Sequence, residues 1–342
     1  MMKYFTNLLG YLVLFLSLLF LIHKIYIFKS DIKYFLTKKE ILFFIVWAAC
    51  FYTIILTLLV FSWGTFLQIF EKKNFAIIYF IYARSQIAKY LPGNIFHYAG
   101  RQTIGYTFGL KHLPIFMATL LESILLIMAA ILIAICGIPL LKFIKESWKL
   151  LFILESISLV SFVLLIFFLP KILNYFSSLQ KIFGKFIVLD AKSWFKLISF
   201  PLLLYILTFI LIGVLLWIIA IFCFKIETSW RTFLAFPTVF AMAWVLGFIT
   251  PGAPGGIGVR EAILIVGLSP FIGKSVASNI SILSRIITIL GDFFFYLSSY
   301  VVPSFLNRRG RGSPRCRSPS PDAFLARAKK GETCSTEHDL PR

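Results

Sequence analysis

The sequence predicts an all-α membrane protein, a polytopic bundle of about eight transmembrane helices. Hydrophobic residues make up 60% of the 342 residues, and 39 residues are phenylalanine. A soluble domain is nearer to about 45–50% apolar. Several apolar runs exceed the roughly 18 residues that indicate a transmembrane helix. A transmembrane β-barrel would instead show short segments of alternating polarity.

The apolar runs give nine segments, of which one is broken and one is short. Because a helix rises about 1.5 Å per residue, about 20 residues are needed to cross the hydrocarbon core. The predicted segments are 8–28, 41–61, 75–106 (broken), 114–138, 150–169, 198–224, 233–249, 257–269 (short) and 275–302.

We divide the chain into a membrane domain, residues 1–306, and a basic tail, residues 307–342. The tail is rich in Arg, Ser and Pro and has almost no aromatic residues, so we expect it to be disordered. Residues 1–306 contain 20 Lys and 5 Arg, whereas the tail contains 2 Lys and 7 Arg. This switch suggests a different sequence origin for the tail, such as a frameshift or a fusion.

The formal net charge of +20 would point to nucleic acid in a soluble protein. In a membrane protein it is better explained by loop lysines that face anionic lipid headgroups. We therefore expect membrane lipids, and not nucleic acid, as partners. The cysteines show no zinc-like or disulfide-like spacing. We expect no metal and no other cofactor.

The most informative segment is 250–261, TPGAPGGIGVRE, which we call the second break. It contains Pro251 and Pro254 and four glycines between two apolar runs. A helix in lipid must satisfy its own backbone hydrogen bonds, so such a break is tolerated only inside protein or beside a wet cavity. Breaks of this kind are typical of re-entrant elements and of binding sites in transporters.

The first break is residues 84–101, RSQIAKYLPGNIFHYAGR. Pro92 and Gly93 are expected to end one helix, and Asn94 to cap the next. Asn94, His97 and Arg101 are spaced i, i+3 and i+7, so they form one polar stripe. Arg84 and Lys89 precede the kink on the first half. Together these groups suggest a site for an anionic headgroup; an interfacial loop with snorkelling basic side chains is the alternative.

The second break offers a complementary anion site. Gly255, Gly256 and Gly258 precede a helix that we expect to start near Ile257. A helix N-terminus presents free N–H groups and favours anions, and Arg260 lies in its first turn. Glu261 could cap this helix, pair with Arg260 or Arg101, or take up a proton.

Three further ionisable residues lie inside apolar segments: Glu122, Arg285 and Asp292. Such residues mark functional sites in membrane proteins. An Arg285–Asp292 or Arg285–Glu122 pair would be the structural explanation, and the acids would balance charge in the empty site. We find no Ser-His-Asp set or other nucleophile–base arrangement, so no catalytic residue is predicted.

The segments KYLPGNIFHYAGR and PGAPGGIGVREAIL resemble the flippase-like membrane domain, also called the lysylphosphatidylglycerol synthase transmembrane region. The resemblance implies re-entrant elements around a lipid-accessible cavity, and lipid translocation or a supporting role in envelope assembly. The residues carried over by the motif match are Arg84, Lys89, Pro92, Gly93, His97, Arg101, Pro254, Gly255, Gly256, Gly258, Arg260 and Glu261. Synthases of this family add a large soluble domain that transfers the amino acid. The 342 residues contain no such domain, so we do not expect synthase activity.

These observations predict a multi-pass protein of the cytoplasmic membrane that handles an anionic lipid, either a phospholipid or a lipid-linked glycan on polyprenyl phosphate. A non-enzymatic translocator is the leading hypothesis. One alternative is a membrane glycosyl- or phospho-transferase with Glu261 or Asp292 as the catalytic carboxylate. Another is a structural partner of envelope-synthesis enzymes.

Overall fold

The computed structural model describes residues 39–91, 95–137, 191–227, 229–250, 254–256 and 258–301, with side chains from residue 197 onward in the third range. These residues belong to one compact unit within Met1–Val302. They form helices and short connections, and no strand occurs among them. The predicted spans 8–28 and 150–169 and the tail from Asn307 lie outside the described residues. So do Pro92, Gly93, Asn94 and Pro251.

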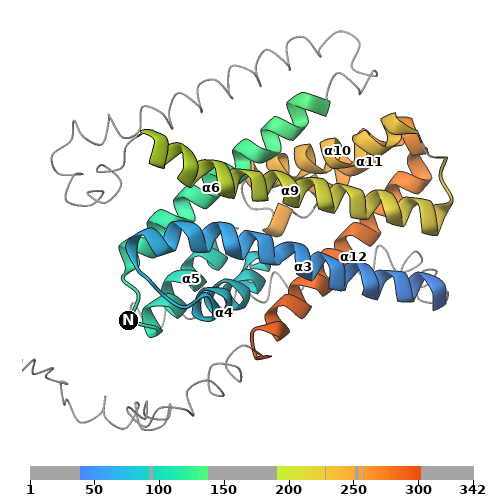
Figure 1. Ribbon diagram of the computed structural model, residues 1–342. Helices are drawn as coiled ribbons and strands as arrows, with labels where there is room; N and C mark the ends of the chain where they lie inside the picture. Colours follow the sequence, from blue (N-terminus) through green and yellow to red (C-terminus); the bar gives the residue numbers. More distant parts are fainter. Residues whose placement is uncertain are drawn as a thin grey trace, which may run out of the picture. The chain divides into compact units, whose positions relative to one another are not determined.

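The apolar runs of the sequence form helices. Figure 1 shows how these helices are arranged. Each of the seven predicted segments in the described part of the chain is helical. The elements are α3 (Lys39–Phe70), α4 (Phe75–Gln86), the 3-10 helix η1 (Ile87–Tyr90), α5 (Phe96–Thr107), α6 (His112–Gly137), α9 (Ala191–Phe224), α10 (Trp230–Ile249), the 3-10 helix η3 (Pro254–Gly256), α11 (Val259–Ile272) and α12 (Lys274–Ser298).

Five helices are long and apolar enough to cross a membrane: α3, α6, α9 from Leu197, α10 and α12. The chain is therefore a multi-pass membrane protein by length and composition. Helix α3 is longer than predicted and continues past Phe61 to Phe70. The additional turns stay helical because Trp63, Phe66 and Leu67 are fully buried against the bundle.

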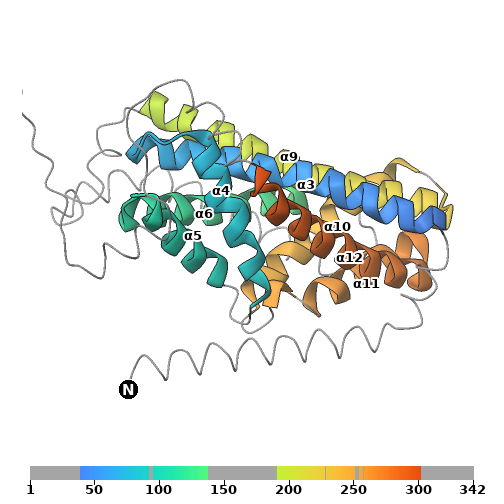
Figure 2. The same ribbon diagram turned by 90° about the horizontal axis from the view of Figure 1, so that it is seen from below.

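Helix α3 packs against α9 on one side and α12 on the other (Figures 1 and 2). Small residues let the backbones approach closely, as is common between membrane helices. A Cβ atom at Gly291 of α12 would lie 3.0 Å from the Ala49 carbonyl oxygen of α3. One at Gly213 of α9 would lie 2.3 Å from Cα of Pro237 in α10. These glycines therefore set how closely the helices pack.

Both breaks give short elements in place of full spans. The first break ends η1 at Tyr90, and α5 begins at Phe96 with Ile95, not Asn94, at the N-cap position. The second break ends α10 at Ile249, and α11 begins at Val259. At 14 residues, α11 is about 21 Å long, which is less than the roughly 30 Å of hydrocarbon in a bilayer. Elements η1 and η3 contact each other, so the two breaks meet in the fold.

Candidate functional site

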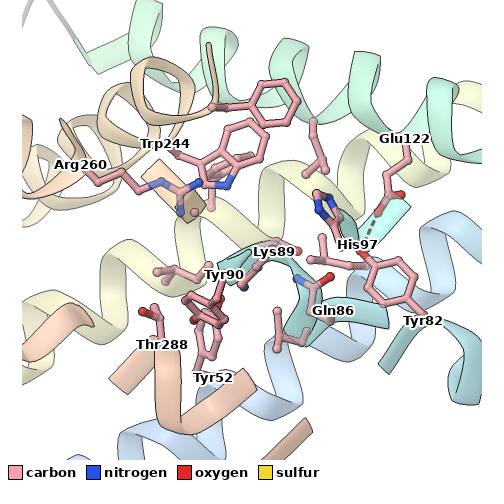
Figure 3. A pocket seen from close by; sticks show the side chains of 18 of the residues that line it. Tyr52, Tyr82, Gln86, Lys89, Tyr90, His97, Glu122, Trp244, Arg260 and Thr288 are labelled. Carbon is pink, nitrogen blue, oxygen red and sulfur yellow. Dashed lines mark hydrogen bonds between the residues drawn. The ribbon is translucent and has the colours of Figure 1, made fainter. Parts of the chain in front are cut away.

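A cavity of about 100 Å³ lies where the two breaks meet (Figure 3). Both breaks contribute to its wall, together with α3, α4, α6, α9, α10 and α12. Its polar lining residues are Tyr52, Tyr82, Gln86, Lys89, Tyr90, His97, Tyr98, Arg101, Glu122, Thr208, Trp244, Arg260, Arg285 and Thr288. Its remaining lining residues are Leu56, Leu59, Leu126, Phe209, Ile212, Phe240, Phe248 and Gly255. The cavity thus combines an apolar wall with four basic side chains.

The first break is held to α12 by a carboxylate. Lys89 Nζ lies 2.7 Å from Asp292 Oδ2 and donates to Asp292 Oδ1 at 2.8 Å. The Tyr90 hydroxyl donates to the same carboxylate at 2.5 Å. Asp292 is fully buried, whereas the Lys89 side chain is 18% exposed. The positive charge of Lys89 is therefore neutralised by Asp292, which is buried and is not a lining residue of the cavity.

The second break is held by Arg285, also from α12. Both terminal nitrogens of Arg285 donate to the Gly255 carbonyl oxygen at 3.3 Å, and Nε lies 3.3 Å from Glu261 Oε1. Glu261 also accepts the backbone N–H of Gly258. Glu261 is thus both a helix cap and the partner of Arg285, and the Gly258 amide is not free for a ligand.

The positive charge of Arg101 is neutralised by a carboxylate from α6. Arg101 pairs with Glu122, and both side chains are buried. Its guanidinium carbon lies 3.9 Å from the ring centre of Tyr82 and 5.3 Å from that of Trp63. The Tyr82 hydroxyl donates to the other oxygen of Glu122 at 2.5 Å (Figure 3). The aromatic rings and the carboxylate enclose this arginine, which is a stable arrangement for a buried guanidinium.

Arg260 is the remaining basic residue of the cavity. Within the described part of the chain no carboxylate lies within ion-pair distance of it, and its buried Nε has no hydrogen-bond partner. Its guanidinium carbon lies 5.7 Å from the Trp244 ring centre (Figure 3). Burial, followed by the nearby charge of Arg285, lowers the pKa of Arg260 to about 10, so it is still cationic at neutral pH.

Two glycines shape the slot in which Arg260 lies. A Cβ atom at Gly256 would be 2.6 Å from Arg260 Nε, and one at Gly247 would be 2.6 Å from Arg260 Cγ. Gly255, Gly256 and Gly258 have φ of 56°, 72° and 91°, the left-handed region that favours glycine. The glycines of the second break therefore serve mainly to position Arg260 and to turn the chain.

The cavity brings together most of the residues predicted from the sequence. Lys89, His97, Arg101, Gly255, Arg260, Glu122 and Arg285 line it. Asp292 and Glu261 lie behind it, bound to lining residues. Arg84 is not a lining residue; its guanidinium lies 4.4 Å from the ring centres of Phe80 and Tyr300.

Four pairings that the sequence offered as alternatives do not form, whereas the cap offered for Glu261 does. Arg285 pairs with Glu261, not with Asp292 or Glu122, because Asp292 lies two turns away and binds the first break instead. In turn, Glu261 pairs with neither Arg260 nor Arg101.

Sequence reasoning missed several lining residues, among them Tyr52, Gln86, Tyr90 and Trp244. Gln86 carried a usable signal, since it is an uncharged polar residue inside a mostly apolar segment. The described residues contain no group of three or more His, Cys, Asp or Glu side chains that could hold a metal ion.

No protein-family model, no curated protein and no solved structure matches this chain. The evidence on function therefore comes from the cavity itself.

Proposed function

We propose that this protein binds an anionic lipid headgroup in the cavity between the two breaks and moves that lipid across the cytoplasmic membrane. The observation that carries the proposal is the charge of Arg260. Lys89, Arg101 and Arg285 each have a carboxylate partner, and Arg260 has none in the described part of the chain. A buried, unpaired charge is costly, so an anion that pairs with Arg260 would be favoured there.

The shape of the site suits a headgroup more than a whole lipid. The cavity holds about 100 Å³, whereas pockets for drug-sized ligands hold roughly 300–1,000 Å³. A phosphate group would fit, with the acyl or prenyl chains left in the surrounding lipid. The guanidinium of Arg260 offers a planar fork that binds two phosphate oxygens at once.

The proposal includes a bundle of about eight spans, with the two breaks as re-entrant elements of the flippase-like family. The motif resemblance and the meeting of η1 with η3 support this arrangement. The transferase alternative has less support. Glu261 and Asp292, its candidate carboxylates, are each held by a cation, and neither lines the cavity.

The test is lipid translocation in proteoliposomes with a fluorescent anionic lipid. Arg260→Gln removes the unpaired charge and keeps a polar, though shorter, side chain. We expect it to weaken binding about 10- to 100-fold, the loss typical of a charge-assisted hydrogen bond, and to abolish transport.

Arg231→Gln is the matched control, because Arg231 is exposed in the first turn of α10 and lies over the Trp230 ring. It should transport like the wild type. Full transport by Arg260→Gln would refute the site.

A further inference from the structure

A second arginine without an anionic partner lies outside the cavity. Arg84, near the end of α4, is half-buried and does not line the cavity. Within the described part of the chain no carboxylate lies within ion-pair distance of it, and its buried Nε has no hydrogen-bond partner. Removing a charged group from water without pairing it is costly. The position of Arg84 therefore needs a further explanation.

Two aromatic rings contact the guanidinium of Arg84. Its central carbon lies 4.4 Å from the ring centre of Phe80, one turn earlier in α4, and 4.4 Å from that of Tyr300, just after α12. Such cation–π contacts stabilise the charge. A ring face does not replace the oxygen acceptors that the in-plane N–H groups require. The edge of the guanidinium is therefore suited to a planar, bidentate contact with an anion.

Tyr300 brings a second donor to the same place. Its hydroxyl lies 2.9 Å from that of Tyr296, and either oxygen can be the donor in this hydrogen bond. Only one of the two protons is used within the pair, so the other is free to donate to a third group. A guanidinium edge and a phenol proton both donate. Together they favour an acceptor with negative charge, such as a phosphate oxygen.

This cluster lies at the end of a membrane span. The apolar span of α12 ends at Ser298, two residues before Tyr300. Tyrosine is enriched at that level because its ring is apolar and its hydroxyl is polar. Asp292, which holds the first break, is eight residues earlier, or about 12 Å away along the helix. The cluster is therefore expected at the height of the lipid headgroups.

The cluster is also separate from the cavity. Arg84 and Gln86 are two residues apart, so they lie about 200° apart around α4, and it is Gln86 that lines the cavity. The cluster instead lies at the junction of α4 and α12, whose last turns pack side by side (Figure 2). At this junction the hydroxyls of Tyr79 and Ser298 are hydrogen-bonded at 2.5 Å. An anion bound here would contact both helices.

We infer that Arg84 and the Tyr296–Tyr300 pair form a second anion site, which binds the phosphate of a lipid in the adjacent leaflet and holds α4 against α12. The site does not depend on the proposed function, because its lipid is a structural one and is not the lipid that moves. A free phosphate ion offers the same chemistry and is the alternative source. The place of the cluster at the end of a span favours the lipid.

The test uses Arg260→Gln as the background, because the cavity has then lost its unpaired cation. The purified full-length chain in a neutral detergent is titrated with phosphatidylglycerol, and bound lipid is counted by native mass spectrometry. We expect one lipid to stay bound to Arg260→Gln and to raise its unfolding temperature. In Arg84→Gln/Arg260→Gln this binding should weaken about 10- to 100-fold, as the loss of a charge-assisted hydrogen bond gives, and the rise should disappear.

The matched control is Arg231→Gln/Arg260→Gln, which removes an exposed arginine and should behave like Arg260→Gln. Tyr300→Leu in the same background removes one ring and one hydroxyl from an exposed position. It should weaken lipid binding in the same direction, and it tests the site even if Arg84→Gln fails to fold.

The outcomes separate the lipid, the free anion and the cavity. Equal lipid binding by the Arg84 and Arg231 double variants would overturn the inference. If inorganic phosphate stabilises Arg260→Gln as much as the lipid does at equal concentration, the site takes a free anion and the lipid assignment is overturned. Binding in the cavity is the part that Arg260→Gln removes. If Arg260→Gln removes none while Arg84→Gln still loses one lipid, the proposed function fails and this inference stands.

Discussion

Arg285 and Asp292 lie two turns apart on α12, and each binds a different break in the chain. Arg285 donates to the Gly255 carbonyl and pairs with Glu261 in the second break. Asp292 pairs with Lys89 in the first break. One helix therefore holds both irregular segments against the cavity, and its two charges are compensated by the segments that it holds.

Asp292→Asn is expected to destabilise the protein by about 3–5 kcal/mol, because it leaves Lys89 without its carboxylate in a mostly buried position. Thermal unfolding in a neutral detergent measures the loss. The double variant Lys89→Met/Asp292→Asn removes both charges and should be more stable than Asp292→Asn alone. Additive losses in this cycle would show that the pair does not hold the first break.

Arg101 is expected to contribute to stability more than to binding. Arg101→Ala leaves Glu122 buried and unpaired, so we predict a loss of about 3–5 kcal/mol in the free energy of unfolding. Arg101→Lys keeps the charge but loses the planar stacking on Tyr82, for a loss of about 1–2 kcal/mol. Lipid binding by Arg101→Lys should remain near the wild-type value. A large loss of binding without a loss of stability would instead place Arg101 among the ligand contacts.

Gly256→Ala tests the slot around Arg260. Both Gly256 and Gly273 have a positive φ, of 72° and 79°, so alanine at either position costs about 1–3 kcal/mol of backbone strain. Only at Gly256 would the new Cβ atom meet Arg260, since nothing lies within 4 Å at Gly273. We predict that Gly256→Ala loses anionic lipid binding and that Gly273→Ala keeps it. Equal binding by the two variants would show that the glycine does not position the arginine.

The buried imidazole of His97 predicts a pH-dependent stability. Its pKa is lowered to about 2 in the folded protein, whereas an unfolded histidine titrates near pH 6.5. Between these values the unfolded chain binds more protons, so stability falls as the pH falls below about 6.5. From pH 7 to pH 5 this amounts to about 2 kcal/mol.

His97→Gln removes this contribution, so its stability should fall less than that of the wild type over the same pH range. Unfolding followed at both pH values measures the difference in slope. If stability falls by the same amount with pH in the two proteins, protonation of His97 does not destabilise the folded protein.

The helical elements were predictable because lipid imposes a simple rule on them. Apolar runs of about 20 residues become helices, and the Pro/Gly-rich segments at 91–95 and 250–258 interrupt them. The exact ends were less predictable. Helix α3 extends to Phe70 because Trp63, Phe66 and Leu67 are buried against the bundle, and α5 begins after Ile95.

The sequence by itself determined that the chain is helical and apolar, where its helices break, and which intramembrane charges need partners. Only the tertiary structure decided which charges pair. Lys89 finds Asp292, Arg101 finds Glu122 and Arg285 finds Glu261. The physical reason is that a buried charge is compensated by whatever lies within about 4 Å of it, and several pairings of the same residues are equally compatible with the sequence. The packing of α12 against both breaks selects one of them, and it leaves Arg260 as the cation without a carboxylate partner in the cavity.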